Sequence, residues 1–470
     1  MTPTNPAAAG GAPGACAPSI PTPSTVALSA TGATICALAS GAGRAGVAVI
    51  RVSGPASGLA AKALAGSVPP PRKTALRVLR SGRGEAIDQA LVLWFPGPES
   101  FTGEDIAEFH VHGGPAVIAA VMDALLGLPG LRLSEPGEFT RRAFEHGKLD
   151  LTEAEGLADL VDAETEGQRR QALRQLQGGL KHIYEGWRAD LLSAIALVEA
   201  DIDFPDEDLP QGLSSRAADH IADLAHGLSE HLNDCRRGER VRDGYRIAII
   251  GAPNAGKSSL LNALAGREAA IVSPFPGTTR DVVEIRLVLA GFPVWIADTA
   301  GLREAADMIE AEGVKRALAR AEEADLRLVV LDATDPAALP EAARPDDLVI
   351  WNKSDLAPWS ASRLLDVCDR ARPIPISAAT GDGLPDLLTA LSARVVQALS
   401  AQETPALSRA RHRALVAAAA QEVNAALAAP APEFAGEHLR RAADALGRLT
   451  GRIHVEDVLG EIFGRFCIGK

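Results

Sequence analysis

The sequence predicts a multidomain α/β protein: an α+β domain comes first, and a helical bundle interrupted by a second α/β domain follows. Three observations support this architecture. The chain has 470 residues, which is too long for one hydrophobic core. A glycine-bounded loop lies between an apolar run and an apolar-periodic helix in RIAIIGAPNAGKSSLLNALAG, 246–266. Stretches rich in Ala, Glu, Leu and Arg lie on both sides of that region, and such residues favour helices.

The composition is that of an ordinary globular protein, with 47% apolar and 23% charged residues. A formal charge of −13 argues against a broadly basic nucleic-acid surface, so any such contact has to be local. The five cysteines lack metal-ligand spacing, which predicts reduced thiols in a cytoplasmic protein. No apolar run reaches transmembrane length. Residues 1–32 contain no Lys or Arg and are predicted to be a disordered extension, not a signal peptide.

The region 33–147 has an α+β pattern. Short β-like runs (GVAVIRV, ALRVLR, AIDQALVLWF and EFHVH) alternate with two helical runs, ASGLAAKALAG and AVIAAVMDALLG. His110 and His112 alternate in EFHVH, which predicts that both point to one face of a strand. Because no Cys or carboxylate stands at a supporting ligand spacing, we favour a structural or binding-site role over a metal site.

The central loop has the pattern of a phosphate-binding loop, G-x-x-x-x-G-K-S, from Gly251 to Ser258. Gly251 and Gly256 allow backbone N–H groups to surround a β-phosphate. Lys257 supplies a cation to the β- and γ-oxygens, and Ser258 offers a hydroxyl to Mg²⁺. The predicted strand before the loop and the predicted helix after it provide the context that this motif requires.

Two further motifs are predicted to lie at the γ-phosphate. Asp298 follows the strand-like FPVWIA and can reach Mg²⁺ through water, while the backbone of Gly301 can meet the γ-phosphate. PGTTRD, 276–281, contains Thr279, which we predict as a second Mg²⁺ ligand. Both segments can therefore respond to loss of that phosphate.

Two motifs predict that the base is guanine. NKSD, 352–355, follows the strand-like DLVIW, and the Asp355 carboxylate can accept hydrogen bonds from N1–H and the 2-amino group of guanine. Adenine would leave this carboxylate unpaired, which is costly, so GTP is favoured over ATP. The backbone amide near Ala378, in SAA at 377–379, can support the guanine O6. Together these motifs predict a guanine-nucleotide domain at 244–398.

The stretch DTAGLRE, 298–304, lacks the usual water-orienting residue. Many GTPases have a Gln after D-T-A-G that orients the attacking water, and here that position is Leu302. A leucine side chain cannot hold water. Spacing alone does not choose among Glu304, Glu310 and Glu312 as its replacement.

Predicted helices flank this domain, at 151–235 with a break at DIDFPDEDLP (201–210), and again at 407–470. Two separate helical domains would explain the pattern. One bundle interrupted by the nucleotide domain is more economical, because the termini of such a domain lie close together and insertion there is tolerated.

The chain resembles the MnmE (TrmE) family of tRNA modification GTPases in three segments: 33–55 (ATICALASGAGRAGVAVIRVSGP), 100–115 (SFTGEDIAEFHVHGGP) and 462–470 (IFGRFCIGK). The resemblance covers essentially everything after residue 32. It implies a P-loop GTPase domain inserted into a helical bundle and preceded by an α+β folate-binding-like domain. The implied domains are the N-terminal tetrahydrofolate-binding and dimerisation domain at 33–147, the helical parts at 148–243 and 399–470, and the G domain at 244–398.

The resemblance also implies a hydrolytic mechanism. Family members use K⁺ in place of an arginine finger, and a monovalent cation beside the phosphates offsets charge that moves onto the leaving oxygen. The implied K⁺ ligands are Asn254, Ser273, Phe275 and Thr278; the Mg²⁺ ligands are Ser258 and Thr279; the catalytic residues are Glu310, which positions water, and Lys257. The full set of expected GTP contacts is Asn254, Ala255, Gly256, Lys257, Ser258, Ser259, Ser273, Pro274, Phe275, Pro276, Gly277, Thr278, Thr279, Asp298, Thr299, Ala300, Gly301, Asn352, Lys353, Asp355, Ser377, Ala378 and Ala379.

The function implied by the resemblance is tRNA modification by a cytoplasmic homodimer. With the flavoprotein MnmG, family members add a carboxymethylaminomethyl or aminomethyl group at C5 of the wobble uridine, using a 5-formyltetrahydrofolate-type carbon donor. The implied folate contacts are Arg51, Glu104, Lys148 and Lys470, which offer cations to a glutamate tail and a carboxylate to a pterin ring. Cys467 is expected to be a small buried hydrophobe and not a nucleophile.

Two alternatives stay open from sequence. One is a regulatory GTPase in ribosome assembly, against which stand the single phosphate loop and the acidic total. The other is a folate-dependent one-carbon transferase with GTP as a structural ligand. Local basic clusters at 141–142, 236–242, 409–413 and 440–441 are candidates for tRNA contact, although solvated helical faces explain them equally well.

Overall fold

The computed structural model describes residues 32–203, 213–266, 284–298, 322–335, 344–357, 373–400, 405–451, 456–464 and 466–469. These residues divide into two compact units: 32–100 with 104–134 and Gly469 in one, and the remainder in the other. The predicted N-terminal extension lies, except for Gly32, outside the described residues. Within the described ranges no helix combines the length and apolar character needed to cross a membrane.

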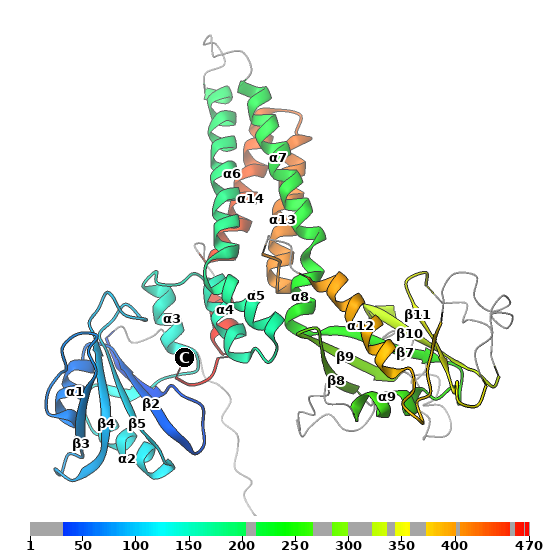
Figure 1. The fold of residues 1–470 in the computed structure, drawn as a ribbon. Coiled ribbons are helices and arrows are strands. Elements are labelled where there is room, and N and C mark those ends of the chain that lie inside the picture. The colour runs from blue at the N-terminus through cyan, green and yellow to red at the C-terminus, as the bar shows by residue number, and fades with distance from the viewer. Residues whose placement is uncertain are drawn as a thin grey trace, which may run out of the picture. The chain divides into compact units, whose positions relative to one another are not determined.

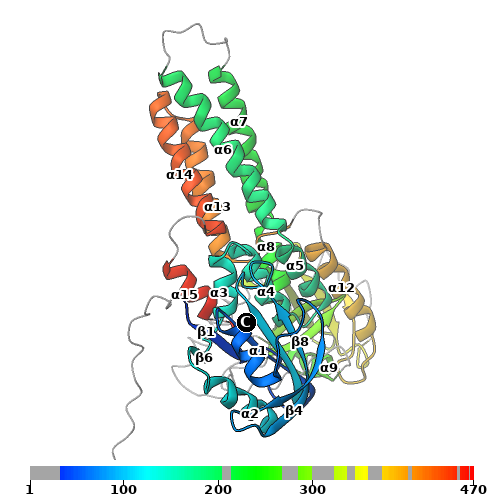
Figure 2. The same ribbon diagram turned by 90° about the vertical axis from the view of Figure 1, so that its left-hand side faces the viewer.

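The first unit contains a mixed sheet with two helices on one face (Figure 2). Its described strands run in the order β3-β4-β5-β2-β1-β6, and only the β1–β6 pair is parallel. Alternating residues such as Ile50 and Phe109 pack under the helices, so their neighbours Arg51 and Glu108 lie on the helix-free face. The elements are β1 (Thr34–Leu38), β2 (Ala45–Ser53), α1 (Ser57–Ala65), β3 (Ala75–Arg80), β4 (Ala86–Phe95), β5 (Ile106–Gly113), α2 (Pro115–Leu126) and β6 (Leu131–Leu133).

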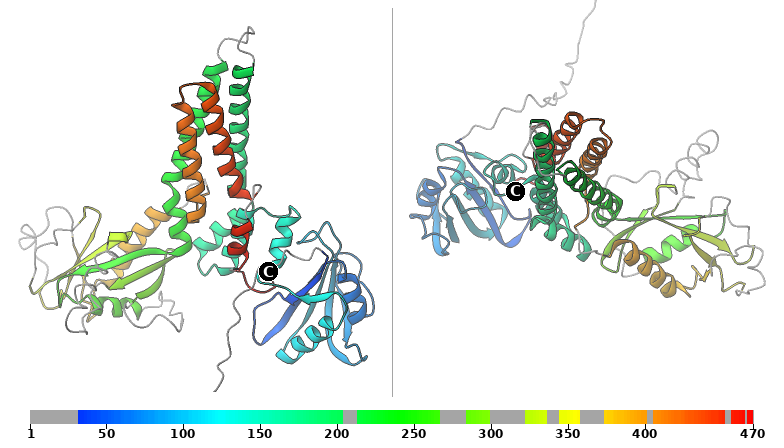
Figure 3. Two further views of the ribbon diagram at one scale, coloured as in Figure 1. Left: turned by 180° about the vertical axis from the view of Figure 1, so that it is seen from behind. Right: turned by 90° about the horizontal axis from the view of Figure 1, so that it is seen from above.

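A bundle of four long helices forms one core from two distant parts of the sequence (Figures 1 and 3). The helices are α6 (Gly179–Asp203), α7 (Leu213–Asn233), α13 (Ala410–Leu427) and α14 (Pro432–Thr450). Leu191 and Leu224 pack in the same apolar cluster as Val416 and Leu446. The predicted single, interrupted bundle is therefore confirmed. The break predicted at 201–210 begins too early, because α6 continues to Asp203; residues 204–212 lie outside the described part of the chain.

Shorter helices lie beside the bundle: α3 (Glu138–Glu145), α4 (Leu151–Asp162), α5 (Glu166–Leu176), α8 (Cys235–Asp243) and α15 (Glu456–Gly464). Capping boxes built on Asp150 and Thr165 satisfy the first N–H groups of α4 and α5. Gly238 of α8 approaches Leu407 so closely that a Cβ on it would lie 2.1 Å from the Leu407 carbonyl oxygen. The chain therefore enters and leaves the inserted domain at one place.

The inserted domain is a doubly wound sheet. Its described strands run in the order β12-β11-β10-β7-β9-β8, all parallel to their neighbours except β8, which is antiparallel to β9. Because parallel strands share a direction, the loops that follow Gly251, Asp298 and Asn352 all leave the same edge of the sheet. The elements are β7 (Tyr245–Gly251), α9 (Lys257–Ala265), β8 (Glu284–Leu289), β9 (Phe292–Asp298), β10 (Leu326–Asp332), β11 (Leu348–Asn352), β12 (Ile374–Pro375) and α12 (Leu384–Leu399).

The bundle core encloses a titratable aromatic cluster. The His231 ring packs edge-on against Tyr184 and Trp187, with centroid separations of 6.1 and 5.1 Å. Only 6% of His231 is exposed, and this burial lowers its pKa from 6.5 to about 4. The imidazole is therefore neutral at pH 7 in the folded chain.

We predict that this histidine makes the bundle acid-labile. The unfolded chain binds the proton near pH 6.5 and the folded chain only near pH 4, so the stabilisation is complete above pH 6.5 and is lost as the pH falls toward 4. The loss is on the order of 2–3 kcal/mol. Urea unfolding followed by helix circular dichroism at pH 7 and pH 4.5 measures it, and His231→Gln is expected to lose less stability on acidification than the wild type. His226→Gln, at a side chain 76% exposed, is the control; equal acid sensitivity of wild type and His231→Gln contradicts the prediction.

Candidate functional site

The phosphate-binding loop has a backbone that only glycine accommodates at two positions. Gly251 and Gly256 have φ of 151° and 89°. A Cβ on Gly251 would lie 2.3 Å from the Val330 carbonyl oxygen, and one on Gly256 would lie 2.2 Å from Asn352 Nδ2. The loop thus packs against β10 and β11 without room for side chains, and this close packing fixes its path from β7 into α9.

Three side chains from two motifs meet at this loop. Lys257 is 6% exposed and its Nζ donates to the carbonyl oxygens of Gly251 (3.0 Å) and Ala252 (2.7 Å). Ser258 Oγ donates to Asp298 Oδ2 at 2.6 Å. The structure therefore brings together the ammonium, hydroxyl and carboxylate groups that a triphosphate with Mg²⁺ requires.

Asn352 ties the phosphate loop to the predicted base-binding segment. It is 1% exposed, its Nδ2 donates to the Ala255 carbonyl oxygen at 2.8 Å, and its Oδ1 accepts from the Ala378 N–H at 3.1 Å. Ser377 is fully buried, whereas Asp355 and Ala379 are exposed at the same edge of the sheet. The two predicted base-side motifs are thus held together, and Asn352 also joins them to the phosphate loop.

Lys353 is held in a left-handed conformation, with φ of 64°, and its Nζ binds Asp332 Oδ2 at 2.6 Å. Burial alone would raise the pKa of Asp332, but Lys353 and Thr334 outweigh it and lower that pKa. The Asp332 carboxylate at the end of β10 therefore fixes the lysine of NKSD, a contact that the sequence did not predict.

Several predicted residues lie outside the described part of the chain: Ser273, Pro274, Phe275, Pro276, Gly277, Thr278, Thr279, Thr299, Ala300, Gly301, Glu310 and Lys470. Of the predicted K⁺ ligands the structure therefore describes only Asn254, which is exposed with φ of 63°, and of the Mg²⁺ ligands only Ser258. Ala255 is buried and Ser259 exposed. Among the residues that are described, no group of three or more His, Cys, Asp or Glu is arranged to hold a metal.

On the helix-free face of the N-terminal sheet, Arg51 pairs with a carboxylate that the sequence did not predict. Arg51 Nε donates to Glu108 Oε1 at 2.9 Å, and His110 Nε2 lies 3.3 Å from Glu108 Oε2. The predicted Glu104 instead accepts from Ser53 Oγ at 2.7 Å. Arg51 and Glu108 are direct partners in the β2–β5 register, so a correct strand pairing would have found this pair. Lys148, after α3, is half-buried.

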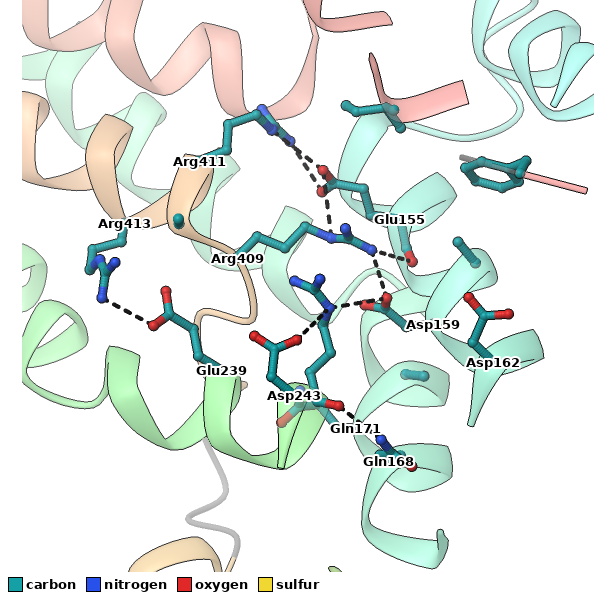
Figure 4. A pocket seen from close by; sticks show the side chains of 16 residues that line it. Glu155, Asp159, Asp162, Gln168, Gln171, Glu239, Asp243, Arg409, Arg411 and Arg413 are labelled. Carbon is teal, nitrogen blue, oxygen red and sulfur yellow. Dashed lines mark hydrogen bonds and ion pairs between the residues drawn. The ribbon is translucent and has the colours of Figure 1, made fainter. Parts of the chain in front are cut away.

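A polar cavity of about 560 Å³ lies among α4, α5, α8, α13 and α15 (Figure 4). Among its lining residues, Glu155 is 2% exposed and accepts from His412 Nε2 at 2.6 Å and from Arg411 Nη2 at 3.1 Å. Burial alone would raise the pKa of Glu155, but His412 and the arginines outweigh it and hold that pKa well below its usual range. Burial, together with Glu155, raises the pKa of Asp159 to about 6 against the opposing effect of Arg409.

The basic clusters noted in the sequence are largely paired within the chain. Within 409–413, Arg409 binds Asp159 at 2.6 Å and Arg413 binds Glu239 at 3.0 Å. Within 236–242, Arg240 binds Asp325 at 2.6 Å. The clusters at 141–142 and 440–441 likewise contact carboxylates. Arg409, Arg413 and Arg440 join helices to one another and Arg240 joins α8 to the inserted domain, a role that neither interpretation from sequence included. Arg141, Arg142 and Arg441 instead pair with carboxylates of their own helices.

Cys467 is exposed, so the expectation that it is a small buried hydrophobe is wrong. Its neighbour Phe466 packs with Phe463, Leu151 and Ala154, whereas Ile468 is 60% exposed. Apolar neighbours in sequence did not predict burial because the chain at 466–469 is neither helix nor regular strand, so Phe466 is buried while the next two side chains, Cys467 and Ile468, are exposed.

Comparisons with known proteins agree along the chain. The family model described as the MnmE helical domain matches residues 151–467, and the model of the GTP-binding protein TrmE N-terminus matches residues 34–148. The tRNA modification GTPase MnmE of Maricaulis maris (strain MCS10) is 55% identical over 444 residues, which cover 93% of this chain and 99% of that protein. The proteins of the same name from Phenylobacterium zucineum (strain HLK1) and Parvibaculum lavamentivorans (strain DS-1) are also 55% identical, over 443 and 446 residues; each match covers 93% of this chain, with 99% and 100% of the respective protein.

We predict that Asp355→Asn reverses base selectivity. The amide loses the charged acceptor for the guanine N1–H and 2-amino groups, so GTP affinity falls by about 100-fold or more, while xanthosine triphosphate, which presents an acceptor in place of the 2-amino group, gains affinity. Titration with fluorescent analogues of both nucleotides measures this. Asp346→Asn, an exposed carboxylate ahead of β11 on the opposite edge of the sheet, is the matched control. Unchanged GTP affinity in Asp355→Asn would remove Asp355 from the base site.

Proposed function

Because this chain belongs to the MnmE family of tRNA modification GTPases, we propose that it hydrolyses GTP to GDP and phosphate in the course of modifying tRNA. The observation that carries this proposal is the convergence of Lys257, Ser258, Asp298 and Asn352 at one edge of the inserted sheet. Such an edge, outside the carboxyl ends of parallel strands, is where doubly wound domains bind nucleotides.

The described residues have separate proposed roles in nucleotide binding. Lys257 and the loop N–H groups hold the phosphates, Asn352 keeps the phosphate loop against the base segment, and Asp355 selects guanine. Oxygen groups suit Mg²⁺, and the Ser258 hydroxyl beside the Asp298 carboxylate fits such an ion, with Thr279 as the further ligand. The remaining contacts are those that the sequence analysis names in 254–259, 273–279, 298–301 and 377–379.

Hydrolysis needs a group that Leu302 does not supply. Glu310 is our proposed water-positioning residue, and K⁺ held by Asn254, Ser273, Phe275 and Thr278 is the proposed charge-stabilising ion. Of these, Asn254 is described, and its exposed position on the phosphate loop fits a ligand of an ion beside the β- and γ-phosphates. K⁺ would also bring two G domains of a homodimer together.

For the N-terminal domain we propose binding of a 5-formyltetrahydrofolate-type carbon donor. The match to the TrmE N-terminus supports this, as does the paired guanidinium and carboxylate of Arg51 and Glu108, which are 23% and 15% exposed. Arg51, Glu104, Lys148 and Lys470 are the proposed contacts, with Glu108 added by the structure. A guanidinium suits the tail carboxylates of such a donor, and a carboxylate suits the amino and ring N–H groups of a pterin.

The proposed modification adds a carboxymethylaminomethyl or aminomethyl group at C5 of the wobble uridine, jointly with a flavoprotein partner, MnmG, in the cytoplasm. Since the basic clusters at 236–242 and 409–413 pair with carboxylates of the same chain, they offer little free charge to a phosphate backbone. The partner is therefore proposed to supply much of the tRNA contact.

We predict that cells lacking this chain lose the modified wobble nucleosides. Mass spectrometry of digested tRNA is expected to show them in the wild type, absent in the deletion strain and restored by the intact gene. A gene carrying Asp355→Asn is expected not to restore them, whereas Asp346→Asn is. An unchanged nucleoside profile in the deletion strain would leave the GTPase assignment standing and remove the tRNA function.

We also predict that GTP turnover depends on K⁺. If K⁺ offsets charge on the leaving oxygen, replacing KCl with NaCl at equal ionic strength lowers the rate by about tenfold or more. Asn254→Ala is expected to lower the rate in KCl toward the rate in NaCl, because it removes one ion ligand. Phosphate release under saturating GTP measures both effects, and equal rates in the two salts exclude the ion from the mechanism.

A further inference from the structure

The hairpin of β8 and β9 joins the two segments proposed to respond to the γ-phosphate. β8 begins at Glu284, shortly after the PGTTRD segment (276–281), and β9 ends at Asp298, the first residue of D-T-A-G. The tip of the hairpin is a tight turn at Ala290 and Gly291, with φ of 50° and 82°. This turn lies at the end of the hairpin opposite to the phosphate loop.

The hairpin tip docks on the N-terminal turn of α5. The Gly167 N–H donates to the Gly291 carbonyl oxygen at 2.8 Å. A Cβ on Gly167 would lie 2.5 Å from Phe292 Cδ1 and 2.7 Å from Cε1, so the ring of Phe292 packs directly on the helix backbone. Glu164, just ahead of α5, forms an ion pair with Arg286 of β8. Arg286 is also stacked over Trp295, its guanidinium carbon 5.3 Å from the ring centroid.

The opposite end of β9 contacts the nucleotide site. Asp298 accepts the hydrogen bond from Ser258, the proposed Mg²⁺ ligand. Between Asp298 and Phe292 the strand spans roughly 20 Å and is paired on both sides, with β7 and with β8. A paired strand moves as a rigid element, so a displacement at Asp298 reaches the tip.

From α5 the contacts continue to other helices through side-chain hydrogen bonds, those of Gln175 being buried. Gln175 Nε2 donates to the Thr152 carbonyl oxygen at 2.9 Å, and Gln175 Oε1 accepts from Ser408 Oγ at 2.9 Å. Gln168 Nε2 donates to the Arg242 carbonyl oxygen at 2.8 Å. α5 is therefore joined to α4, to α8 and to the chain that leads into α13.

We propose that Gly167 and Glu164 are positioning residues that dock the β8–β9 hairpin on α5, and that this contact carries the state of the bound nucleotide to the helical bundle. The proposal rests on the proposed function, in which GTP hydrolysis serves chemistry carried out elsewhere in the protein. Gly167 is the second residue of α5, where alanine would be a better helix former. Helix formation therefore does not explain a glycine here, whereas the contact with Phe292 does.

The test compares amide hydrogen exchange of the first turns of α5 in purified full-length protein with GDP and with a non-hydrolysable GTP analogue. In the wild type the exchange rates are expected to differ between the two nucleotides by about threefold or more. Gly167→Ala is expected to abolish this difference, because the new methyl group separates α5 from the hairpin tip. Both measurements are made with the nucleotide saturating, so a change in affinity does not enter the comparison. Equal exchange with both nucleotides in the wild type overturns the proposal, as does a difference that persists in Gly167→Ala.

Gly186→Ala is the matched control, since it makes the same substitution inside α6 at a position where a Cβ meets nothing within 4 Å. It is expected to retain the nucleotide-dependent difference. Should Gly167→Ala fail to fold, Glu164→Gln replaces it, because this change removes the ion pair with Arg286 and leaves the Thr165 capping box intact. A smaller difference in Glu164→Gln supports the proposal, and an unchanged one overturns it.

This experiment contains no tRNA, so its outcome is separable from the proposed function. Loss of the wobble nucleosides in the deletion strain, together with nucleotide-independent exchange of α5, would overturn only the hairpin contact. An unchanged nucleoside profile together with the expected exchange difference would instead overturn the tRNA function, and would leave a GTPase whose nucleotide state reaches its helices for another purpose.

Discussion

The architecture depends on one close approach between the two connections of the inserted domain. At Gly238 and Leu407 the chain entering the domain touches the chain leaving it, with no space for a Cβ. Because these connections meet, helices far apart in the sequence, such as α6 (179–203) and α14 (432–450), can share one core. The insertion also places α8 directly ahead of β7, the strand that leads into the phosphate loop. The phosphate loop therefore follows closely after the first helical part of the chain in the sequence.

The contact between these two connections also brings many of the arginines close to carboxylates and carbonyl oxygens of the same chain. Arg242 of α8 donates to the Ser408 carbonyl oxygen at 3.0 Å, and Arg409 and Arg411 reach back to Asp159 and Glu155 of α4. A buried carboxylate such as Glu155 is tolerated only with partners, and His412 together with two arginines supplies them. An acidic protein can thus contain several arginine clusters without a basic surface.

Sequence alone predicted most of the fold, and it named residues that the structure brings together at the candidate nucleotide site, because both depend on local patterns. Strand periodicity located β2 to β5, helical composition located the interrupted bundle, and fixed spacings located Lys257, Ser258 and Asp355. Features that depend on contacts between distant parts of the sequence were not predicted. Glu108 is identified only through the β2–β5 register, and the pairing of Arg409 with Asp159 spans 250 residues. The exposure of Cys467 depends on the irregular path of residues 466–469, where the apolar neighbours Phe466 and Ile468 had suggested burial.

The residues proposed to bind GTP and the residues proposed to hydrolyse it lie in different parts of the inserted domain. The groups proposed to select guanine and to hold the phosphates stand at strand ends and on a glycine-constrained loop, tied together by Asn352. Such a site is formed in advance and needs little rearrangement to bind. The proposed groups for hydrolysis, Thr279, Glu310 and three K⁺ ligands, instead belong to the segments that β8 and β9 connect. Since the tip of that hairpin rests on α5, the hairpin that connects the segments proposed for hydrolysis is also the part of the inserted sheet that contacts the helical domain.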